Sequence, residues 1–215
     1  MLIIGAKGFA KEVLEIFKQL NETKNIAFYD DVNTYMDYSL YNVYPILKNK
    51  IEVETYFNKN GNSFTLGIGN PVLRYKMASK FNSLGGKLVS IISPQAIIGS
   101  YDVNVGMGTN ILAQATLSNS VTIGNGCIIY YNVIITHDCK VGDFVELSPG
   151  ATLLGNVVVG SFSQIGSNAT ILPNVSIGKN VTIGAGAVVI NNVPDNSVVV
   201  GIPAKIIKTV EPLNF

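Results

Sequence analysis

The sequence is poor in charge, in cysteine and in histidine, and each shortage excludes a class of protein. Its 215 residues hold 15 Lys+Arg and 14 Asp+Glu, a formal net charge of +1, and only 13% are charged. Nucleic-acid-binding proteins carry a basic excess that neutralises phosphates, so this balance argues against nucleic acid as a partner. Two cysteines are too few for a disulfide framework. Because His137 is the only histidine, any imidazole chemistry must take place there.

Long apolar runs are also missing. No stretch approaches the roughly 20 apolar residues that span a bilayer, so we expect no membrane-spanning segment. The first residues enter a predicted buried strand directly, without the charged and then long apolar stretch of a signal peptide. Because 47% of the residues are hydrophobic, apolar surface is ample for a folded core. The sequence therefore predicts a soluble, cytoplasmic protein.

A six-residue repeat dominates the second half of the chain. Fifteen positions spaced by six, from Val105 to Val189, are all aliphatic. Four residues after each of them, from Thr109 to Val193, the side chain is small. A slower period of 18 residues is superimposed on the first, in Gly106, Gly124, Gly142, Gly160 and Gly178.

This double period predicts a triangular coil. Each hexapeptide forms one short face with its aliphatic residue inward, and three faces close a turn. Successive turns then stack about 4.8 Å apart through backbone hydrogen bonds, and no turn is stable alone. A glycine directly after an inward residue, as in this 18-residue series, suits a bend that needs positive φ or close backbone approach. Ordinary strands of a sandwich require period two and irregular loops, which this pattern does not fit.

The first ninety residues alternate between strand and helix patterns, which predicts a small parallel sheet. Asn70 and Pro71 suit the N-cap and first position of a helix. Ligands of such sheets bind beyond the carboxyl ends of the strands. We therefore divide the chain into an α/β domain at 1–90, an all-β prism at 91–193 and a tail at 194–215. The predicted strands are 2–5, 26–29, 64–68 and 88–92, and the predicted helices are 9–20 and 71–81.

Two groups of residues in the first domain suit a nucleotide. Gly5 and Gly8 stand between a strand and a helix, where backbone amides and the helix N-terminus meet phosphates. A tight strand–helix turn would use glycine as well. Asp30 and Asp31 end the second strand, where acceptors for a nucleotide are found; a solvated turn is the alternative explanation.

His137 occupies the third place of its hexapeptide, where the other coils carry turn-type residues, so we expect it at an outward corner of the prism. It is either an exposed turn histidine or a catalytic base. Asp138 follows at once, and a prism edge is where two subunits would meet, which favours catalysis. Cys127 and Cys139 stand at the small-residue position and are expected to be packing residues rather than nucleophiles.

The repeat resembles the hexapeptide-repeat superfamily of left-handed parallel β-helices, most of which are trimeric acyltransferases. Further motifs resemble one branch, the sugar acetyltransferases that include sialic acid O-acetyltransferases and nucleotide-linked amino-sugar N-acetyltransferases. These motifs are Gly5-Ala6-Lys7-Gly8 with Lys11-Glu12-Val13-Leu14-Glu15, Phe28-Tyr29-Asp30-Asp31, Gly67-Ile68-Gly69-Asn70 with Arg74, Thr136-His137-Asp138-Cys139-Lys140-Val141-Gly142-Asp143-Phe144 and Gly201-Ile202-Pro203-Ala204-Lys205.

The resemblance implies a homotrimer with acetyl-CoA in the groove between neighbouring prisms, and no metal. It implies that His137 is the general base, that Asp138 orients it, and that the Gly155 amide stabilises the oxyanion. It also implies a nucleotide-sugar site in the first domain. The acetyl-CoA residues would be Glu146, Gly155, Ser167 and Ala185, and the nucleotide-sugar residues Gly5, Lys7, Gly8, Asp30, Asp31, Gly69 and Asn70.

Two positions depart from the family. Phe9 and Glu146 stand where relatives commonly carry histidine, near the sugar phosphate and near acetyl-CoA respectively. We expect N-acetylation of a nucleotide-activated amino sugar, such as a 4-amino-4,6-dideoxy sugar, by direct transfer from the thioester. O-acetylation of a sialic acid or related sugar is one alternative, and a catalytically silent nucleotide-binding scaffold is another. A metal enzyme on the same prism would need three histidine ligands, and this chain has one.

Overall fold

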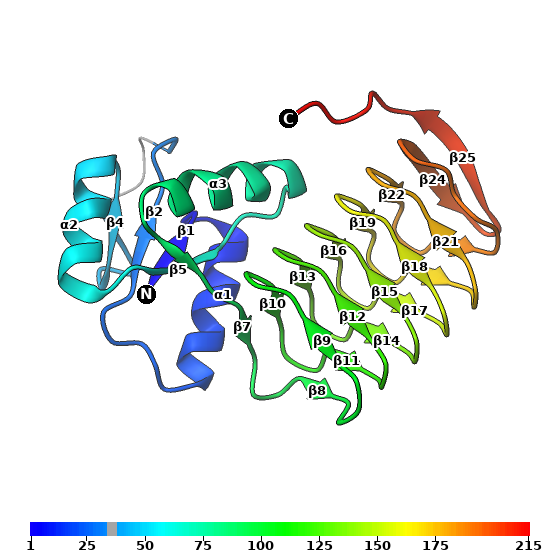
Figure 1. Cartoon of the computed structure of the whole chain (residues 1–215), viewed down its shortest axis with the longest axis horizontal. Coiled ribbons are helices and arrows are strands. Elements are labelled where there is room, and N and C mark those ends of the chain that lie inside the picture. Colours follow the sequence, from blue (N-terminus) through cyan, green and yellow to red (C-terminus); the bar gives the residue numbers. More distant parts are fainter. Residues whose placement is uncertain (34–37) are drawn as a thin grey trace.

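The computed structural model consists of a small α/β unit followed by a long triangular prism (Figure 1). It describes residues 1–33 and 38–215. None of the helices in these ranges has the length and apolarity needed to cross a bilayer.

The α/β unit is built on a six-stranded sheet of order β3-β4-β2-β1-β5-β6, parallel except for the β3–β4 pair. The predicted strands at 2–5, 26–29 and 64–68 correspond to β1, β2 and β5. Its strands are β1 (Leu2–Ile4), β2 (Ala27–Tyr29), β3 (Ser39–Leu40), β4 (Tyr44–Leu47), β5 (Ser63–Leu66) and β6 (Lys87–Leu88), and its helices α1 (Gly8–Gln19), α2 (Lys50–Asn60) and α3 (Pro71–Ser83).

The strand predicted at 88–92 is wrong as a single element. β6 closes the α/β sheet against β5, whereas β7 (Ile91–Ile92) pairs with the prism strand β10 (Asn110–Ile111). One apolar stretch therefore serves two different sheets, because the chain turns from one to the other at Val89 and Ser90. Strands β3 and β4 and helix α2 were not predicted from the sequence.

The helix starts differ in their capping. The Asn70 side chain accepts a hydrogen bond from the Leu73 amide, as predicted, and Pro71 opens α3. Asn49 caps α2 in the same way. By contrast, α1 begins at Gly8 with no side-chain cap and no acidic residue in its first turn. Its first amides therefore point out of the helix without a side-chain acceptor.

The prism has three faces, each a parallel sheet whose neighbouring strands are one coil apart in the sequence. Face 1 comprises β7, β10, β13 (Ile128–Ile129), β16 (Glu146–Leu147), β19 (Gln164–Ile165), β22 (Thr182–Ile183), β24 (Ser197–Gly201) and, antiparallel, β25 (Ala204–Thr209). Face 2 comprises β8 (Ile97–Ile98), β11 (Thr116–Leu117), β14 (Ile134–Ile135), β17 (Thr152–Leu153), β20 (Thr170–Ile171) and β23 (Val188–Val189). Face 3 comprises β9 (Asn104–Val105), β12 (Thr122–Ile123), β15 (Lys140–Val141), β18 (Val158–Val159) and β21 (Ser176–Ile177).

The predicted inward residues form the prism core. Ile135, Leu153 and Ile171 stack on face 2 and are fully buried. Cys127 and Cys139 are buried free thiols in the same core, as expected of packing residues. Burial raises the pKa of the Cys127 thiol to about 12, so it stays protonated and unreactive.

The positive φ values at the corners belong to other residues than the glycines that follow the inward positions. The residue three places after each inward residue, from Gly108 to Gly186, has positive φ. The glycine directly after the inward residue has not; it allows close approach instead. A Cβ on Gly124 would lie 2.6 Å from the carbonyl carbon of Gly142 on the next coil. Of the two reasons considered for these glycines, close backbone approach is therefore the correct one.

One corner holds an additional residue. Inward residues of successive faces are six apart, but Ile98 and Val105 are seven apart, across the corner between β8 and β9. Tyr101 at this corner is 73% exposed. Both strands nevertheless keep their register, β8 with β11 and β9 with β12.

The α/β unit covers the first part of face 1. The outward residues Ile91, Asn110 and Ile128 are buried beneath it. The Asn110 side chain joins the two units, because it accepts from the Thr65 hydroxyl and donates to the Leu66 carbonyl. At the far end the chain turns through β24 and β25, and its last residues return toward α3 (Figure 1), where Phe215 packs against Tyr75 with ring centroids 4.7 Å apart.

Candidate functional site

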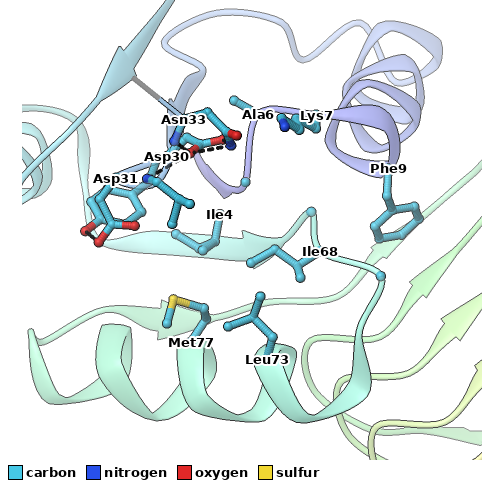
Figure 2. A pocket seen from close by; sticks show the side chains of 15 residues that line it. Ile4, Ala6, Lys7, Phe9, Asp30, Asp31, Asn33, Ile68, Leu73 and Met77 are labelled. Atoms are coloured by element: carbon cyan, nitrogen blue, oxygen red, sulfur yellow. Dashed lines mark hydrogen bonds between the residues drawn. The ribbon is translucent and has the colours of Figure 1, made fainter. Parts of the chain in front are cut away.

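A cavity of about 340 Å³ lies beyond the carboxyl ends of β1, β2 and β5. It stands where the sequence predicted a ligand, between the loop before α1, the end of β2 and the start of α3 (Figure 2). Of the residues predicted for a nucleotide sugar, Gly5, Lys7, Asp30, Asp31 and Gly69 line this cavity, and Gly8 and Asn70 do not.

The two loop glycines serve different purposes. Gly5 has φ +103°, and a Cβ there would lie 2.7 Å from the carbonyl oxygen of Gly67, so the fold itself requires glycine. Gly8 has no such requirement, because a Cβ there would meet nothing within 4 Å. Open space above Gly8 adjoins the uncapped start of α1, where free amides and the helix dipole favour an anion.

The two aspartates are also different. Asp30 accepts the amides of Val32 and Asn33 at 3.2 and 3.0 Å, and the Asn33 side chain binds both of its carboxylate oxygens. This carboxylate therefore stabilises its own turn. Asp31 Oδ2 accepts from the Tyr29 hydroxyl at 2.7 Å and the Lys80 ammonium at 3.1 Å, and the side chain is 40% exposed. Asp30 is buried, so Asp31 is the aspartate that is more accessible to a ligand.

Two other predicted positions lie at the rim. Asn70 does not line the cavity, because its side chain is used as the cap of α3. Phe9 does line it, at the end that faces the prism (Figure 2). Its ring lies 5.3 Å from the ring of Tyr130, which follows face 1 strand β13.

His137 lies at the corner between faces 2 and 3, with its side chain 62% exposed. Its Nδ1 is 2.7 Å from Oδ2 of Asp138. Two adjacent residues contact each other because Asp138 has φ +61°, which turns its carboxylate back onto the preceding ring. A carboxylate on Nδ1 holds the ring with Nε2 available to accept a proton.

The His137 ring packs directly against the backbone of Gly155. A Cβ on Gly155 would lie 2.6 Å from Cε1 and 2.8 Å from Nε2 of His137 in the same chain. Within the described residues no carbonyl accepts from the Gly155 amide, although Leu154 donates to Ile171 and Asn156 donates to His137. A proton acceptor and an uncommitted amide donor therefore stand side by side on successive coils.

Glu146 stands on face 1, where the cover of the α/β unit ends. Its side chain is 14% exposed, and its Oε2 is 3.9 Å from the guanidinium of Arg74. The carboxylate also accepts from Gln164 at 3.2 Å and from Ser148 at 3.3 Å. A Cβ on Gly69 would be 4.0 Å from Oε2, so Glu146 adjoins the loop that lines the cavity.

Arg74, which belongs to the family resemblance but has no role predicted from the sequence, connects the two units. It is fully buried and donates to the carbonyls of Gly126, Phe144 and Val145 on the prism and of Gly69 in the cavity loop. Burial lowers its pKa to about 10, which leaves it charged at neutral pH. Its role could not be predicted from the sequence, because its partners are backbone carbonyls of distant segments.

The remaining predicted residues lie on another edge. Ser167 follows β19 and Ala185 follows β22, so both stand at the corner between faces 1 and 2. His137 stands at the corner opposite face 1. A single chain therefore does not bring its own cavity, Glu146, Ser167 and Ala185 together with its own His137.

The chain is similar to known families over both units. The PglD N-terminal domain matches residues 1–81, and the bacterial transferase hexapeptide (six repeats) matches residues 120–155 and 156–191. GDP-perosamine N-acetyltransferase of Escherichia coli O157:H7 is 28% identical over 154 residues, 69% of this chain and 67% of that protein.

Solved structures match nearly the whole chain. The acetyltransferase domain of PglB from Neisseria gonorrhoeae FA1090 is 32% identical with a TM-score of 0.87, covering 96% of this chain and 98% of that one. It has also been solved with acetyl coenzyme A. PerB from Caulobacter crescentus, solved with CoA and GDP-perosamine, is 30% identical with a TM-score of 0.87 over 95% of both chains.

Proposed function

Since the chain belongs to the hexapeptide-repeat family of sugar acetyltransferases, we propose that it transfers the acetyl group of acetyl-CoA to the amine of a nucleotide-linked amino sugar. The observation that carries this proposal is the pairing of the His137–Asp138–Gly155 corner with a cavity at the end of a parallel sheet. Relatives of similar architecture were solved with CoA and GDP-perosamine. Acetyl-CoA is the donor, and the cytoplasm, where it is available, is the proposed location.

The chemistry is direct transfer. The amine nitrogen attacks the thioester carbonyl carbon while Nε2 of His137 takes the amine proton, and the C–S bond breaks as CoA thiolate leaves. The proton then passes from the imidazolium to the thiolate. Asp138 holds the ring and stabilises the imidazolium, and the Gly155 amide donates to the oxyanion.

The acceptor is held by residues 1–90. Its diphosphate lies over Gly8 at the start of α1, with Gly5, Lys7 and Gly69 around it. Asp31 contacts the base, because the Asp30 carboxylate is already hydrogen-bonded within its own turn. This assignment is supported by the open space at Gly8 and by the exposure of the Asp31 side chain at the cavity.

The active site forms between two copies of the chain in a homotrimer. One copy contributes His137, Asp138 and Gly155, and its neighbour contributes the cavity together with Glu146, Ser167 and Ala185 along the prism at 91–193. The support for this arrangement is that these two groups occupy opposite sides of one prism. Acetyl-CoA lies in the groove between the two prisms.

An assay of CoA release tests the function. We expect turnover with acetyl-CoA and GDP-perosamine, with an N-acetylated sugar as the product by mass spectrometry. The 4-hydroxy counterpart of the same GDP-sugar serves as the control for O-acetylation. Turnover of that compound alone would indicate an O-acetyltransferase, and binding of both sugars without CoA release would indicate a silent scaffold.

The loop glycines give a matched pair of variants. Gly8→Val is expected to leave thermal unfolding unchanged, because its side chain meets open space, and to abolish the rise in Tm that GDP causes. Gly5→Ala is expected to lower Tm without ligand, since it combines a positive φ with a clash. Thermal unfolding with GDP, UDP, dTDP and CMP measures both effects and ranks the nucleotides. Unchanged GDP binding by Gly8→Val would contradict the phosphate position.

Mixing two inactive variants tests the shared site. His137→Ala lacks the base, and Gly8→Val lacks the acceptor site, but a mixed trimer contains one intact pairing of His137 with a neighbour's cavity. Random reassembly of equal amounts is expected to restore about a quarter of wild-type activity. Gel filtration verifies the trimer, and each variant reassembled alone is the control. No recovery in verified mixed trimers would place the whole site within one chain.

A further inference from the structure

Glu12 is a half-buried carboxylate without a cation. It lies on α1 one helical turn after Phe9, close enough to the Tyr130 hydroxyl for each group to shift the pKa of the other. Among the described residues it forms no ion pair. Burial raises its pKa, with the Tyr130 hydrogen bond acting in the opposite direction. A carboxylate removed from water is costly unless a charged partner or several donors compensate it.

Glu146, the other partly buried carboxylate nearby, is compensated already. Arg74 lies 3.9 Å from it, and Gln164 and Ser148 donate to it. A second cation at Glu146 would be repelled by the Arg74 guanidinium. Glu12 has no such neighbour, so it is the carboxylate that is free to receive a positive charge from a ligand.

The surroundings of Glu12 suit a sugar. The rings of Phe9 and Tyr130, 5.3 Å apart, form an apolar wall beside it. Tyr130 packs against the hydrophobic cores of both the prism and the α/β unit, so this wall is fixed in place. Burial and the negative charges of Glu12 and Glu146 raise the pKa of Tyr130, which keeps its hydroxyl a donor.

The position follows from the proposed acceptor site. A diphosphate over Gly8 places the attached sugar next to Phe9, which lines the prism-facing end of the cavity. From Phe9 to Glu12 is one turn, about 4.5 Å along the helix axis at 1.5 Å per residue. A sugar that leaves the cavity along this face of α1 therefore meets the aromatic wall first and the carboxylate next.

We propose, on the basis of the function proposed above, that Glu12 with Phe9 and Tyr130 forms a subsite that binds the amino group of the acceptor sugar. The carboxylate accepts an N–H from the amine in both its ammonium and its neutral form. In the neutral form this hydrogen bond turns the nitrogen lone pair away from Glu12, toward the open side where the thioester arrives. The aromatic rings contact the C–H groups of a deoxygenated sugar ring. A hydroxyl also donates to a carboxylate but carries no positive charge, so the subsite favours an amine through the charge of its ammonium form.

Glu12→Gln tests the subsite, because it keeps the shape and removes the charge. Glu15→Gln, an exposed carboxylate on the same helix, is the matched control. The probes are GDP, GDP-perosamine and the 4-hydroxy counterpart of that sugar, and calorimetry measures their Kd. We expect Glu12→Gln to raise the Kd of GDP-perosamine by about 10- to 100-fold, which corresponds to the loss of one hydrogen bond to a charged group. Binding of GDP and of the 4-hydroxy sugar is expected to change less than about twofold, the scatter of a neutral substitution.

Three outcomes would overturn the subsite. These are equal binding of GDP-perosamine by wild type and Glu12→Gln, an equal loss for all three probes, and wild-type protein that binds GDP-perosamine no tighter than the 4-hydroxy sugar. The proposed function fails separately. Preferential, Glu12-dependent binding of GDP-perosamine without release of CoA from acetyl-CoA would refute the transferase and leave the subsite intact.

Discussion

His137→Ala is expected to lower kcat at least about 100-fold, the usual range for removing a general base. Without the imidazole, the amine must lose its proton to water while it attacks the thioester. The side chain is 62% exposed, so thermal unfolding and the Kd of GDP-perosamine are expected to stay the same. Steady-state kinetics with acetyl-CoA and GDP-perosamine provide the measurement.

Asp138→Asn is the companion variant. The amide keeps the shape of the carboxylate at Nδ1 but does not stabilise an imidazolium, so we expect a smaller loss in kcat than for His137→Ala. A His137→Ala enzyme with wild-type kcat would show that another group is the base, or that the acceptor amine reacts without one.

Arg74→Met is expected to lower the free energy of unfolding by about 3–5 kcal/mol, the cost of breaking a buried charge pair from one side. The substitution leaves the carbonyls of Gly126 and Phe144 without their donor and Glu146 without its cation. Because Arg74 belongs to the α/β unit and these partners belong to the prism, the loss should appear as a weaker attachment of the α/β unit to the prism. Urea unfolding, followed by circular dichroism, measures it.

Lys80→Met is the control for this prediction. Lys80 also forms an ion pair, with Asp31 at 3.1 Å, but both side chains are about 40% exposed. An exposed pair contributes about 0–1 kcal/mol. If Arg74→Met were no more destabilising than Lys80→Met, the buried guanidinium would not be what joins the two units.

The fold class and the family predicted from the sequence are confirmed by the structure and the comparisons. The prism was predictable because the same aliphatic position recurs in every hexapeptide, and the recurrence makes a weak pattern unmistakable. Ile135, Leu153 and Ile171, for example, occupy the same buried environment in successive coils. Residues 39–60 contain no repeat that would reinforce a weak pattern. In α2 only Val53 and Phe57 are buried, so its sequence carries little helical periodicity.

The candidate site was predictable wherever a side chain is exceptional in the sequence. His137 is the one histidine, and Gly5 and Gly8 mark a loop. The sequence did not distinguish Asp30 from Asp31, because the difference lies in tertiary hydrogen bonds. For the same reason it left open which copy's Gly155 faces His137, which the structure answers: it is the same chain's.

The corner at Tyr101 shows how this protein tolerates insertions and deletions. One additional residue there leaves the register of β8 and β9 intact, because the corner expands into solvent. The same insertion within a two-residue strand would turn an inward aliphatic side chain outward. It would also disrupt the pairing of that strand with the strands of the neighbouring coils. Natural variants and engineered peptide insertions should therefore be accommodated at corners, and the corner farthest from His137 is the place to introduce an affinity tag or a fluorescent label.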